Sequence, residues 1–491
     1  MIRLLRTLPF TACWLIVLVS ESFAQHAPGQ VETYRNFDYV RTVTVSNSSA
    51  YFGTTGGVIR YDRLRQLWSQ PLTGADGTPP EPIQHLWVDR FDQNLYLGTE
   101  LGLYEYDSLL DNWTPVFELP PLDNDIKHVR APDVLMPQFN ALYQGRGEFI
   151  DFYSRHFATT DIVEDASGDL WIGTWGYGPA HANASSGLMD LLPYGLLQNQ
   201  VDVILPDDSV LWLAGPIRND FRTGITGYYP LANRFSYMES GLNGDFPATD
   251  ITCLAADSAR LFVGTPHGFY RINKSDLSTR GPFDANQGLP DDSVVSLAVT
   301  GKSLYVGTVA GLSLIKLGTD SLFSIRPETF HGQIIYDMDV VGNTVWIASS
   351  AGAFRYTPET DRLQQFQDSD LVLFSAVLNV KHLDSSVWLA ADAGVVKLNL
   401  VTGKWESFRE PSSARDRRPL AVNQQLIALA VDRGVELIIP GPKKNRTVTL
   451  TTDDGLASDD VRSLYLSGDY LWVGTDNGLT RFMWNDPRWI D

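Results

Sequence analysis

One sequence pattern recurs along the 491 residues of this chain and constrains its fold more than any other feature. Residues 455–479 read GLASDDVRSLYLSGDYLWVGTDNGL, and residues 288–312 read GLPDDSVVSLAVTGKSLYVGTVAGL. The two segments align without a gap, share 13 identical positions and lie 167 residues apart, which is four periods of about 42. Self-similarity at a period of this size is typical of repeat architectures such as solenoids and β-propellers.

The most regular part of the repeat is an apolar triplet that is followed by a small residue and then, within a few residues, by glycine. The spacing between successive small residues stays between 40 and 50, except for one interval of 75 residues between positions 98 and 173. We therefore predict ten copies, whose small residues are at positions 53, 98, 173, 214, 264, 307, 348, 390, 430 and 474.

Each copy is predicted to form four short strands. In the last copy, VRSLYLS alternates in polarity, YLWVGT follows it, a turn with glycine comes at 476–478, and LTRFMW and PRWI complete the set. Four strands in 40 to 45 residues is the period of a β-propeller blade. The second strand is apolar on both faces because blades pack face to face, and the small residue keeps that strand thin where neighbouring blades crowd it.

The repeats predict an all-β protein with four-stranded antiparallel blades and no appreciable helix. The regular spacing from 173 to 474 favours a single ring of about ten blades. Two smaller propellers are the alternative, and the 75-residue interval has room for an eleventh, degenerate blade. The segment VETYRNF (31–37) resembles a fourth strand placed ahead of the first blade, so we expect it to complete the last blade and lock the ring.

The first 24 residues have the pattern of a secretory signal peptide, and the propeller is assigned to residues 25–491. Arg3 and Arg6 precede the short apolar run ACWLIVLV, and SFA ends in a small residue at Ala24. An uncleaved anchor is the alternative. No later run reaches about 18 apolar residues. We therefore expect an exported protein, periplasmic or extracellular, with no transmembrane segment in the mature chain.

Composition narrows the classes of partner. The net charge of −20 argues against nucleic acid, because phosphate recognition needs clustered Lys and Arg. Hydrophobic residues make up 44% of the chain, which is enough to bury a large core. Cys253 is the only cysteine after the signal segment, so the mature chain has neither a disulfide within it nor a cysteine metal site.

The repeat resembles the two-component regulator propeller repeat. The resemblance rests on Gly455-Leu456, Val461 and LWVGTDNGL in the last copy, on the matching residues of 288–312, and on LWIGT at 170–174. It implies a bacterial, extracytoplasmic, sensor-like propeller, often the periplasmic half of a membrane histidine kinase. No kinase or DNA-binding segment follows the last repeat here, so direct signalling output is not expected.

The 75-residue interval contains an insertion at 119–157, between the second and third blades, that is rich in aromatic and basic residues. It and the turns between second and third strands should share one rim, and loops on a rigid scaffold often bind ligands. The alternatives are that the insertion caps the channel or forms an extra blade. We predict that this rim binds a glycan, peptide or protein through Tyr153, Arg155, Trp175, Tyr177, Arg218, Asp220, Arg222 and His267.

Catalytic signatures are weak. The histidines are scattered without metal-ligand spacing, no nucleophile elbow occurs, and Gly301-Lys302-Ser303 lacks the glycine that a phosphate loop needs five residues earlier. Asp-rich turns such as LPDDS are explained by turn formation without a metal. We therefore expect no cofactor and a ligand-binding protein rather than an enzyme. The alternative is a glycan hydrolase or lyase with its site at the channel mouth, which carboxylates converging on the axis would favour.

Overall fold

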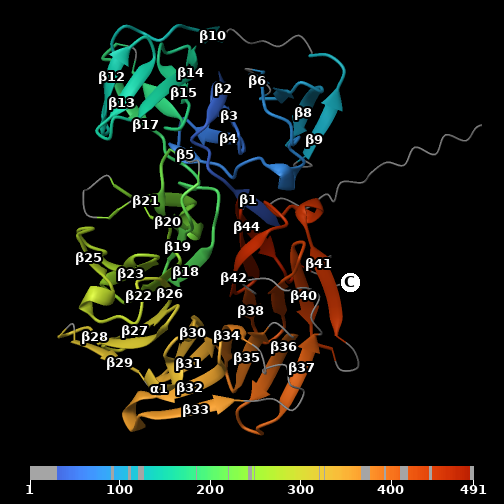
Figure 1. Ribbon diagram of the computed structural model, residues 1–491. Coiled ribbons are helices and arrows are strands. Elements are labelled where there is room, and N and C mark those ends of the chain that lie inside the picture. Colours follow the sequence, from blue (N-terminus) through green and yellow to red (C-terminus); the bar gives the residue numbers. More distant parts are fainter. Residues whose placement is uncertain are drawn as a thin grey trace, which may run out of the picture.

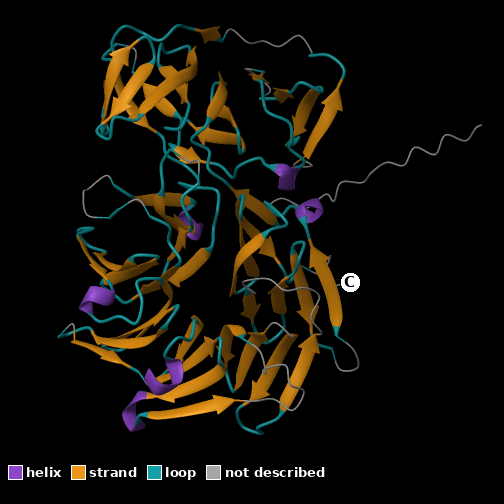
Figure 2. Cartoon of the chain, in the orientation of Figure 1, coloured by secondary structure: helices purple, strands orange, loops and turns teal. Residues whose placement is uncertain are grey.

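The computed structural model describes residues 30–486, except for 90–92, 109–111, 120–125, 184, 219–220, 242–245, 248, 320, 326, 367–375, 392–393, 410–418 and 442–444. Within these residues the strands form ten sheets, nine with four strands and one with eight (Figures 1 and 2). Helical segments in the described part are short: α1 (Pro327–Phe330), η1 (Gly74–Asp76), η2 (Pro230–Ala232), η3 (Ala285–Gln287), η4 (Pro358–Thr360) and η6 (Thr452–Asp454). The predicted all-β fold of antiparallel blades is confirmed.

Seven of the sheets form a closed propeller, which we call the ring. Their first strands contact one another in the order β18, β22, β26, β30, β34, β38 and β42, and β42 contacts β18. The strands are β18 (Val203–Asp207), β19 (Val210–Ala214), β20 (Gly224–Tyr229), β21 (Arg234–Glu239), β22 (Cys253–Ala256), β23 (Arg260–Thr265), β24 (Gly268–Asn273), β25 (Thr279–Phe283), β26 (Val294–Thr300), β27 (Ser303–Thr308), β28 (Gly311–Lys316), β29 (Ser321–Ser324), β30 (Ile335–Val341), β31 (Thr344–Ser349), β32 (Gly352–Thr357), β33 (Arg362–Phe366), β34 (Val377–Leu383), β35 (Ser386–Ala391), β36 (Gly394–Asn399), β37 (Trp405–Arg409), β38 (Leu420–Val422), β39 (Ile427–Ala430), β40 (Val435–Ile439), β41 (Arg446–Leu450), β42 (Val461–Ser467), β43 (Tyr470–Thr475) and β44 (Gly478–Met483).

The other three sheets pack beside one another in a second unit, the arc, above the ring in Figure 1. Strand β2 contacts β14 and β15 on one side and β6 on the other, so the first blade of the chain lies between the third and the second. The strands are β2 (Val40–Val45), β3 (Ser49–Thr54), β4 (Gly57–Asp62), β5 (Leu67–Trp68), β6 (His85–Val88), β7 (Leu95–Gly98), β8 (Leu103–Asp107), β9 (Asn112–Val116), β10 (Lys127–His128), β11 (Met136–Pro137), β12 (Ala141–Gly145), β13 (Glu148–Asp151), β14 (His156–Glu164), β15 (Leu170–Thr174), β16 (Ala180–Ala182) and β17 (Leu188–Leu191).

These contacts correct the prediction of a single ring of about ten blades. The alternative of two smaller propellers is met only in part, because seven blades form a closed propeller and the other three form the arc. The chain passes from the arc to the ring between β17 and β18, within a repeat interval of 41 residues that gave no sign of a boundary. The repeat pattern indicates that each blade is buried on both faces. It does not indicate which blades are neighbours, so the number of blades in a ring could not be predicted from local spacing alone.

The predicted completion of the last blade by the N-terminal segment is confirmed. Strand β1 (Val31–Tyr34) pairs antiparallel with β44, with Val31 opposite Phe482 and Tyr34 opposite Leu479. The N-terminal segment thus supplies the fourth strand of the blade that begins with β42. The segment PRWI, proposed for that place as well, lies outside the described residues.

The small residue after each apolar triplet is required by the neighbouring blade. A Cβ atom on Gly474 would lie 2.2 Å from Ser463 Oγ and 2.5 Å from the carbonyl oxygen of Val201, which belongs to the segment leading into the next blade. Ser463 Oγ donates a hydrogen bond of 2.8 Å to that same carbonyl. Glycine at this position therefore permits the close approach on which the contact between blades depends.

The 119–157 insertion contributes strands to the third blade of the arc. Strand β10 pairs with β14, β11 pairs with β17, and the β12–β13 hairpin extends the sheet beyond β14. Its apolar residues, including Phe149 and Phe157, form one cluster with Ile162, Ile172 and Met189 of the blade. The insertion therefore buries one face of this blade, while Val163 and Trp171 on the other face pack toward the first blade.

One hydrophobic cluster spans the arc and the ring. It contains Val43 and Phe52 of the first blade together with Tyr228 and Trp472 of the ring, and Tyr34 of β1 lies among them. The hydroxyl of Tyr228 donates a hydrogen bond of 2.7 Å to that of Tyr34. The two units thus share a continuous core.

Candidate functional site

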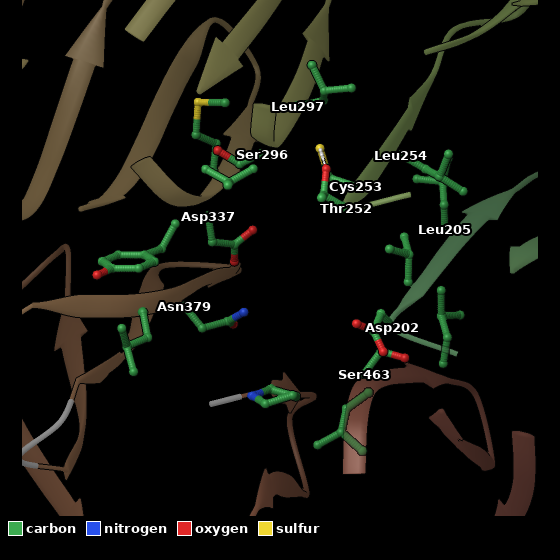
Figure 3. Close-up of a pocket in the computed structure, with 18 of the residues that line it drawn as sticks. Asp202, Leu205, Thr252, Cys253, Leu254, Ser296, Leu297, Asp337, Asn379 and Ser463 are labelled. Carbon is green, nitrogen blue, oxygen red and sulfur yellow. Dashed lines mark hydrogen bonds between the residues drawn. The ribbon is translucent and has the colours of Figure 1, made fainter. Parts of the chain in front are cut away.

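A large concave site lies in the channel of the ring. It is a cavity of about 710 Å³ whose lining comes from all seven blades (Figure 3). The first strand of each blade runs along the axis of the ring. Residues at the start of these strands, and next to it, therefore line the channel together with the equivalent residues of the other blades. The labelled polar residues of this wall are Asp202, Thr252, Cys253, Ser296, Asp337, Asn379 and Ser463.

The acidic residues that β30 places on this wall bind the neighbouring blade. Asp337 Oδ2 accepts hydrogen bonds of 3.1 Å from the backbone amide of Val380 and from Lys381 Nζ. Asp339 Oδ2 accepts one of 2.6 Å from the amide of His382. Burial raises the pKa of Asp339, whereas for Lys381 the two carboxylates outweigh burial and raise its pKa. These carboxylates are therefore engaged in holding two blades together.

Hydroxyl groups on the wall also join neighbouring blades by hydrogen bonds. Ser296 Oγ donates to the carbonyl of Ile335 at 2.6 Å, and Thr252 Oγ1 donates to that of Val294 at 2.5 Å. Two other lining groups retain hydrogen-bonding capacity: Asn379 Oδ1 and Arg462 Nε are buried and have no hydrogen-bond partner. Together with the half-buried rings of Tyr336 and Tyr465, they give the cavity a mixed aromatic and polar lining.

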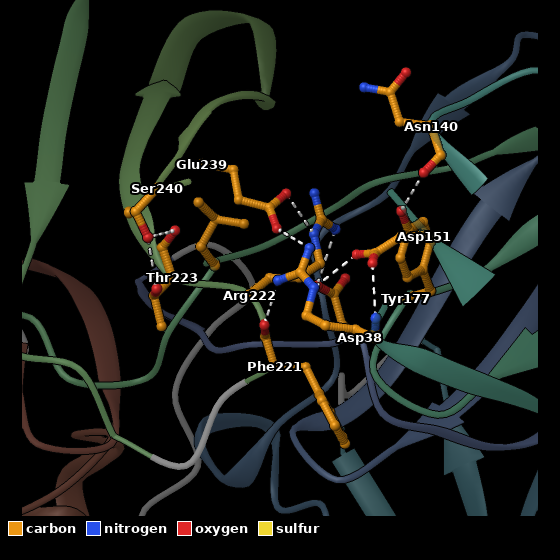
Figure 4. A network of polar contacts seen from close by, with 12 residues as sticks. Asp38, Asn140, Asp151, Tyr177, Phe221, Arg222, Thr223, Glu239 and Ser240 are labelled. Atoms are coloured by element: carbon orange, nitrogen blue, oxygen red, sulfur yellow. Dashed lines mark hydrogen bonds and ion pairs between the residues drawn. The ribbon is translucent and has the colours of Figure 1, made fainter. Parts of the chain in front are cut away.

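Three of the residues predicted to bind ligand lie together where the arc meets the ring. Arg155 follows β13, Arg222 lies in the loop between β19 and β20, and Tyr177 follows β15. Figure 4 shows Arg222 and Tyr177 in a network with Asp38, Asp151 and Glu239. The prediction found these cationic and aromatic members but missed the three carboxylates, which lie in segments that carry no repeat signal.

The network connects the two units by charged hydrogen bonds. Arg222 Nε donates to Glu239 Oε2 at 3.0 Å, and its Nη1 contacts Asp38 Oδ2 at 3.2 Å. Arg155 Nη2 donates to the other oxygen of Glu239 at 2.6 Å, and its Nε donates to Asp151 Oδ2 at 2.6 Å. Since Arg155 and Asp151 belong to the arc and Glu239 to the ring, the paired charges bridge the interface.

The centre of the network is buried. The side chain of Arg222 is 11% exposed and Tyr177 is 7% exposed. Burial alone would lower the pKa of Arg222, but Asp38 and Glu239 outweigh it and hold that pKa above its ordinary value. Burial raises the pKa of the Tyr177 phenol to about 12. Both side chains are therefore packed at the junction of the arc and the ring.

Other predicted residues are exposed beside this network. Trp175 is 36% exposed and Tyr153 is 39% exposed. The Trp175 ring meets Tyr39 edge-on, with ring centres 5.3 Å apart, and the guanidinium of Arg41 lies 5.4 Å from its centre. Tyr39 in turn contacts Phe221. These rings form an aromatic surface at the rim of the junction, of the type that stacks on sugars or peptide side chains.

Within the described part of the chain, the remaining predicted residues make their hydrogen bonds away from this cluster. Arg218 Nε donates to Gln200 Oε1 at 2.9 Å. His267 is exposed in the turn between β23 and β24, where its amide donates to Thr265 Oγ1 at 3.1 Å. Asp220 lies outside the described residues.

We expect Trp175→Ala and Tyr177→Ala to differ clearly in their effect on stability. Trp175 is part of the exposed surface, so its replacement should lower the free energy of unfolding by less than about 1 kcal/mol. Tyr177 packs edge-on against Phe157 at 4.0 Å, so its loss should cost about 3 kcal/mol. Urea denaturation of both variants measures this, and equal losses would contradict the assignment of one to the surface and the other to the core.

A seven-bladed ring that is packed against a three-bladed arc defines the chain as a β-propeller protein. Residues 156–176, which include all of β14 and β15, match the family model described as two component regulator propeller. The chain therefore carries this repeat, as its sequence resemblance predicted.

The solved structures to which the chain is similar are distant from it in sequence. The extracellular domain of a putative one component system from B. thetaiotaomicron is 13% identical, with 90% of this chain and 70% of that chain covered and a TM-score of 0.44. The extracellular domain of a putative hybrid two component system from the same organism is 16% identical, with coverage of 91% and 62% and a TM-score of 0.47.

PorZ of Porphyromonas gingivalis, a bacterial surface component of the type-IX secretion system, is 14% identical, with coverage of 91% and 74% and a TM-score of 0.47. At these identities and TM-scores the likeness assigns no function to this chain. No curated protein showed significant similarity to the chain.

The described residues bear on membrane crossing through their helices and on metal binding through their side chains. None of the helices in this part of the chain is long and apolar enough to cross a membrane. The described side chains also include no group of three or more His, Cys, Asp or Glu that is arranged to hold a metal ion.

Proposed function

We propose that this chain is an exported, sensor-like β-propeller that binds a glycan or peptide in the channel of its ring without chemically changing it. The observation that carries the proposal is the 710 Å³ cavity, to which every blade of the ring contributes. A cavity of this size that combines a few polar groups with aromatic and aliphatic walls is the usual form of a ligand site. Export rests on the signal-peptide pattern of residues 1–24, which lie outside the described part of the chain.

The hydrogen bonds that the channel carboxylates already accept favour binding over hydrolysis. A glycosidase needs a pair of carboxyl groups that are available to the scissile bond, one as acid and one as base or nucleophile. In the channel, Asp337 and Asp339 come from the same strand and accept hydrogen bonds from the next blade. Asp202, the third carboxylate of the lining, accepts a hydrogen bond of 2.9 Å from a nearby glutamine side chain. All three carboxylates are therefore engaged in contacts within the protein. Asn379 and Arg462, whose buried atoms have unused capacity, offer neutral and cationic hydrogen bonds to a ligand.

The experiment is a binding screen of residues 25–491 against glycan and peptide arrays, followed by affinity measurements on variants. Tyr336→Ala and Arg462→Gln should each weaken binding of a hit by about tenfold, the loss of one stacked ring or one charged hydrogen bond. Trp175→Ala is the matched control, since it removes an exposed aromatic ring at the junction rim instead of the channel.

The outcomes separate the three possibilities. Weakening by the channel variants alone supports the proposal. Weakening by Trp175→Ala alone would place the ligand on the rim predicted from the sequence and contradict the channel. Shortened glycan products in mass spectra after incubation would show that the chain is an enzyme and overturn the non-catalytic function.

A further inference from the structure

A second cavity lies between the arc and the ring. Its volume is about 370 Å³, and its lining combines Arg35, which follows β1, and Asn477, in the turn between β43 and β44, with residues of the arc. The arc contributes Arg41 of β2, the turn between β3 and β4, and the loop that leads from β5 to β6. The site therefore exists only where the two units meet.

The cavity wall carries polar atoms whose hydrogen-bonding capacity is not used. Arg35 Nε, Thr78 Oγ1 and Glu81 Oε2 are each buried and have no hydrogen-bond partner. Thr78 is only 7% exposed. A buried polar atom without a hydrogen-bond partner destabilises the folded protein, and three such atoms surround this one cavity. A ligand that satisfied them would recover part of this cost.

The charges define what such a ligand must offer. Arg35 and Arg41 are cations, and only Glu81 among the charged lining residues is an anion. Arg35 is already fixed, because its Nη2 donates to the carbonyl of Ala457 at 3.0 Å. Burial lowers the pKa of Arg35, and a bound anion would oppose that effect. Glu81 in turn requires a donor from the ligand.

We propose that this cavity is a binding site for a small carboxylate that also carries hydrogen-bond donors, either hydroxyl groups or an ammonium group. The carboxylate lies against Arg35 and Arg41, the donors reach Glu81 Oε2, and Thr78 adds a neutral hydrogen bond. Sugar acids and amino acids share this chemistry. The site is separate from the ring channel, so it gives the protein a second ligand whose binding depends on contact between the arc and the ring.

Calorimetric titration of residues 25–491 with D-glucuronate and, separately, with glycine distinguishes the two sources of carboxylate. D-glucose is the matched control, because it has the hydroxyl groups without the carboxylate and should not bind. We expect saturable binding of at least one probe below about 10 mM. Thr78→Val, which keeps the side-chain shape, should weaken it about fivefold, and Glu81→Gln and Arg35→Gln at least tenfold.

Tyr336→Ala, in the ring channel, is expected to leave this binding unchanged, so failure here is distinguishable from failure of the channel proposal. If Arg35→Gln destabilises the fold, Thr78→Val and Glu81→Gln still test whether the probe binds in this cavity. Absence of binding by both probes, or binding that none of the three cavity variants weakens, would overturn the site. Equal binding of D-glucose would overturn the requirement for a carboxylate.

Discussion

Replacing Arg222 by alanine is expected to lower the free energy of unfolding by about 3 to 5 kcal/mol, because two buried carboxylates each lose an ion pair. Asp38 loses the ion pair that joins it to the ring, and Glu239 loses its pair with Arg222 while it retains Arg155. Both carboxylates are nearly inaccessible to water, so solvent cannot replace the lost partner. The same change removes the packing of the guanidinium over the ring of Tyr177.

Urea denaturation followed by intrinsic fluorescence measures this loss. Arg234→Ala is the matched control, since Arg234 also comes from the β18–β21 blade but is exposed and lies over the ring of Tyr229. The control should cost less than about 1 kcal/mol. If the two variants unfold at the same urea concentration, the network at the junction contributes no more than a surface contact, and its assigned role in joining the arc to the ring is wrong.

The prediction of blades from the sequence succeeded because the physical cause is local. A strand that is buried on both faces must be apolar throughout, and a close neighbour excludes any side chain larger than that of a small residue. Gly474 illustrates this, since an added Cβ would collide with Ser463 and Val201. The same reasoning identified residues 31–37 as a strand without a blade of its own, and β1 occupies that place.

The division into arc and ring, and most of the junction, could not be predicted in this way. Tyr177 and Arg222 stand out in the sequence as departures from the repeat, which is consistent with a binding surface and equally with an interface inside the molecule. The positions of Asp38, Asp151 and Glu239 distinguish a binding surface from an internal interface. Those residues come from three separate segments. Contacts between distant segments leave no periodic signal.

Removal of β1 is expected to have the largest effect of any change considered. A chain that begins at Arg35 loses the side chains of Val31 and Tyr34, both almost completely buried, and the main-chain ladder along β44. Burial of two such side chains and several hydrogen bonds corresponds to about 5 kcal/mol or more. Arg481, which pairs with Glu32, would also lose its carboxylate. This is comparable with the whole stability of many domains, so the ring should open.

Thermal unfolding and limited proteolysis compare this chain with a control that begins at Gln30 and retains β1. We expect a much lower unfolding temperature and cleavage within the blade that begins with β42. A synthetic peptide with the sequence of residues 30–37 should restore protection, because an extended peptide can add to the exposed edge of β44 by main-chain pairing. A peptide in which proline replaces Thr33 lacks one amide of the ladder and should restore less. If the shortened chain is as stable as the control, closure of the ring does not depend on β1, and the seven blades are held together by their mutual packing alone.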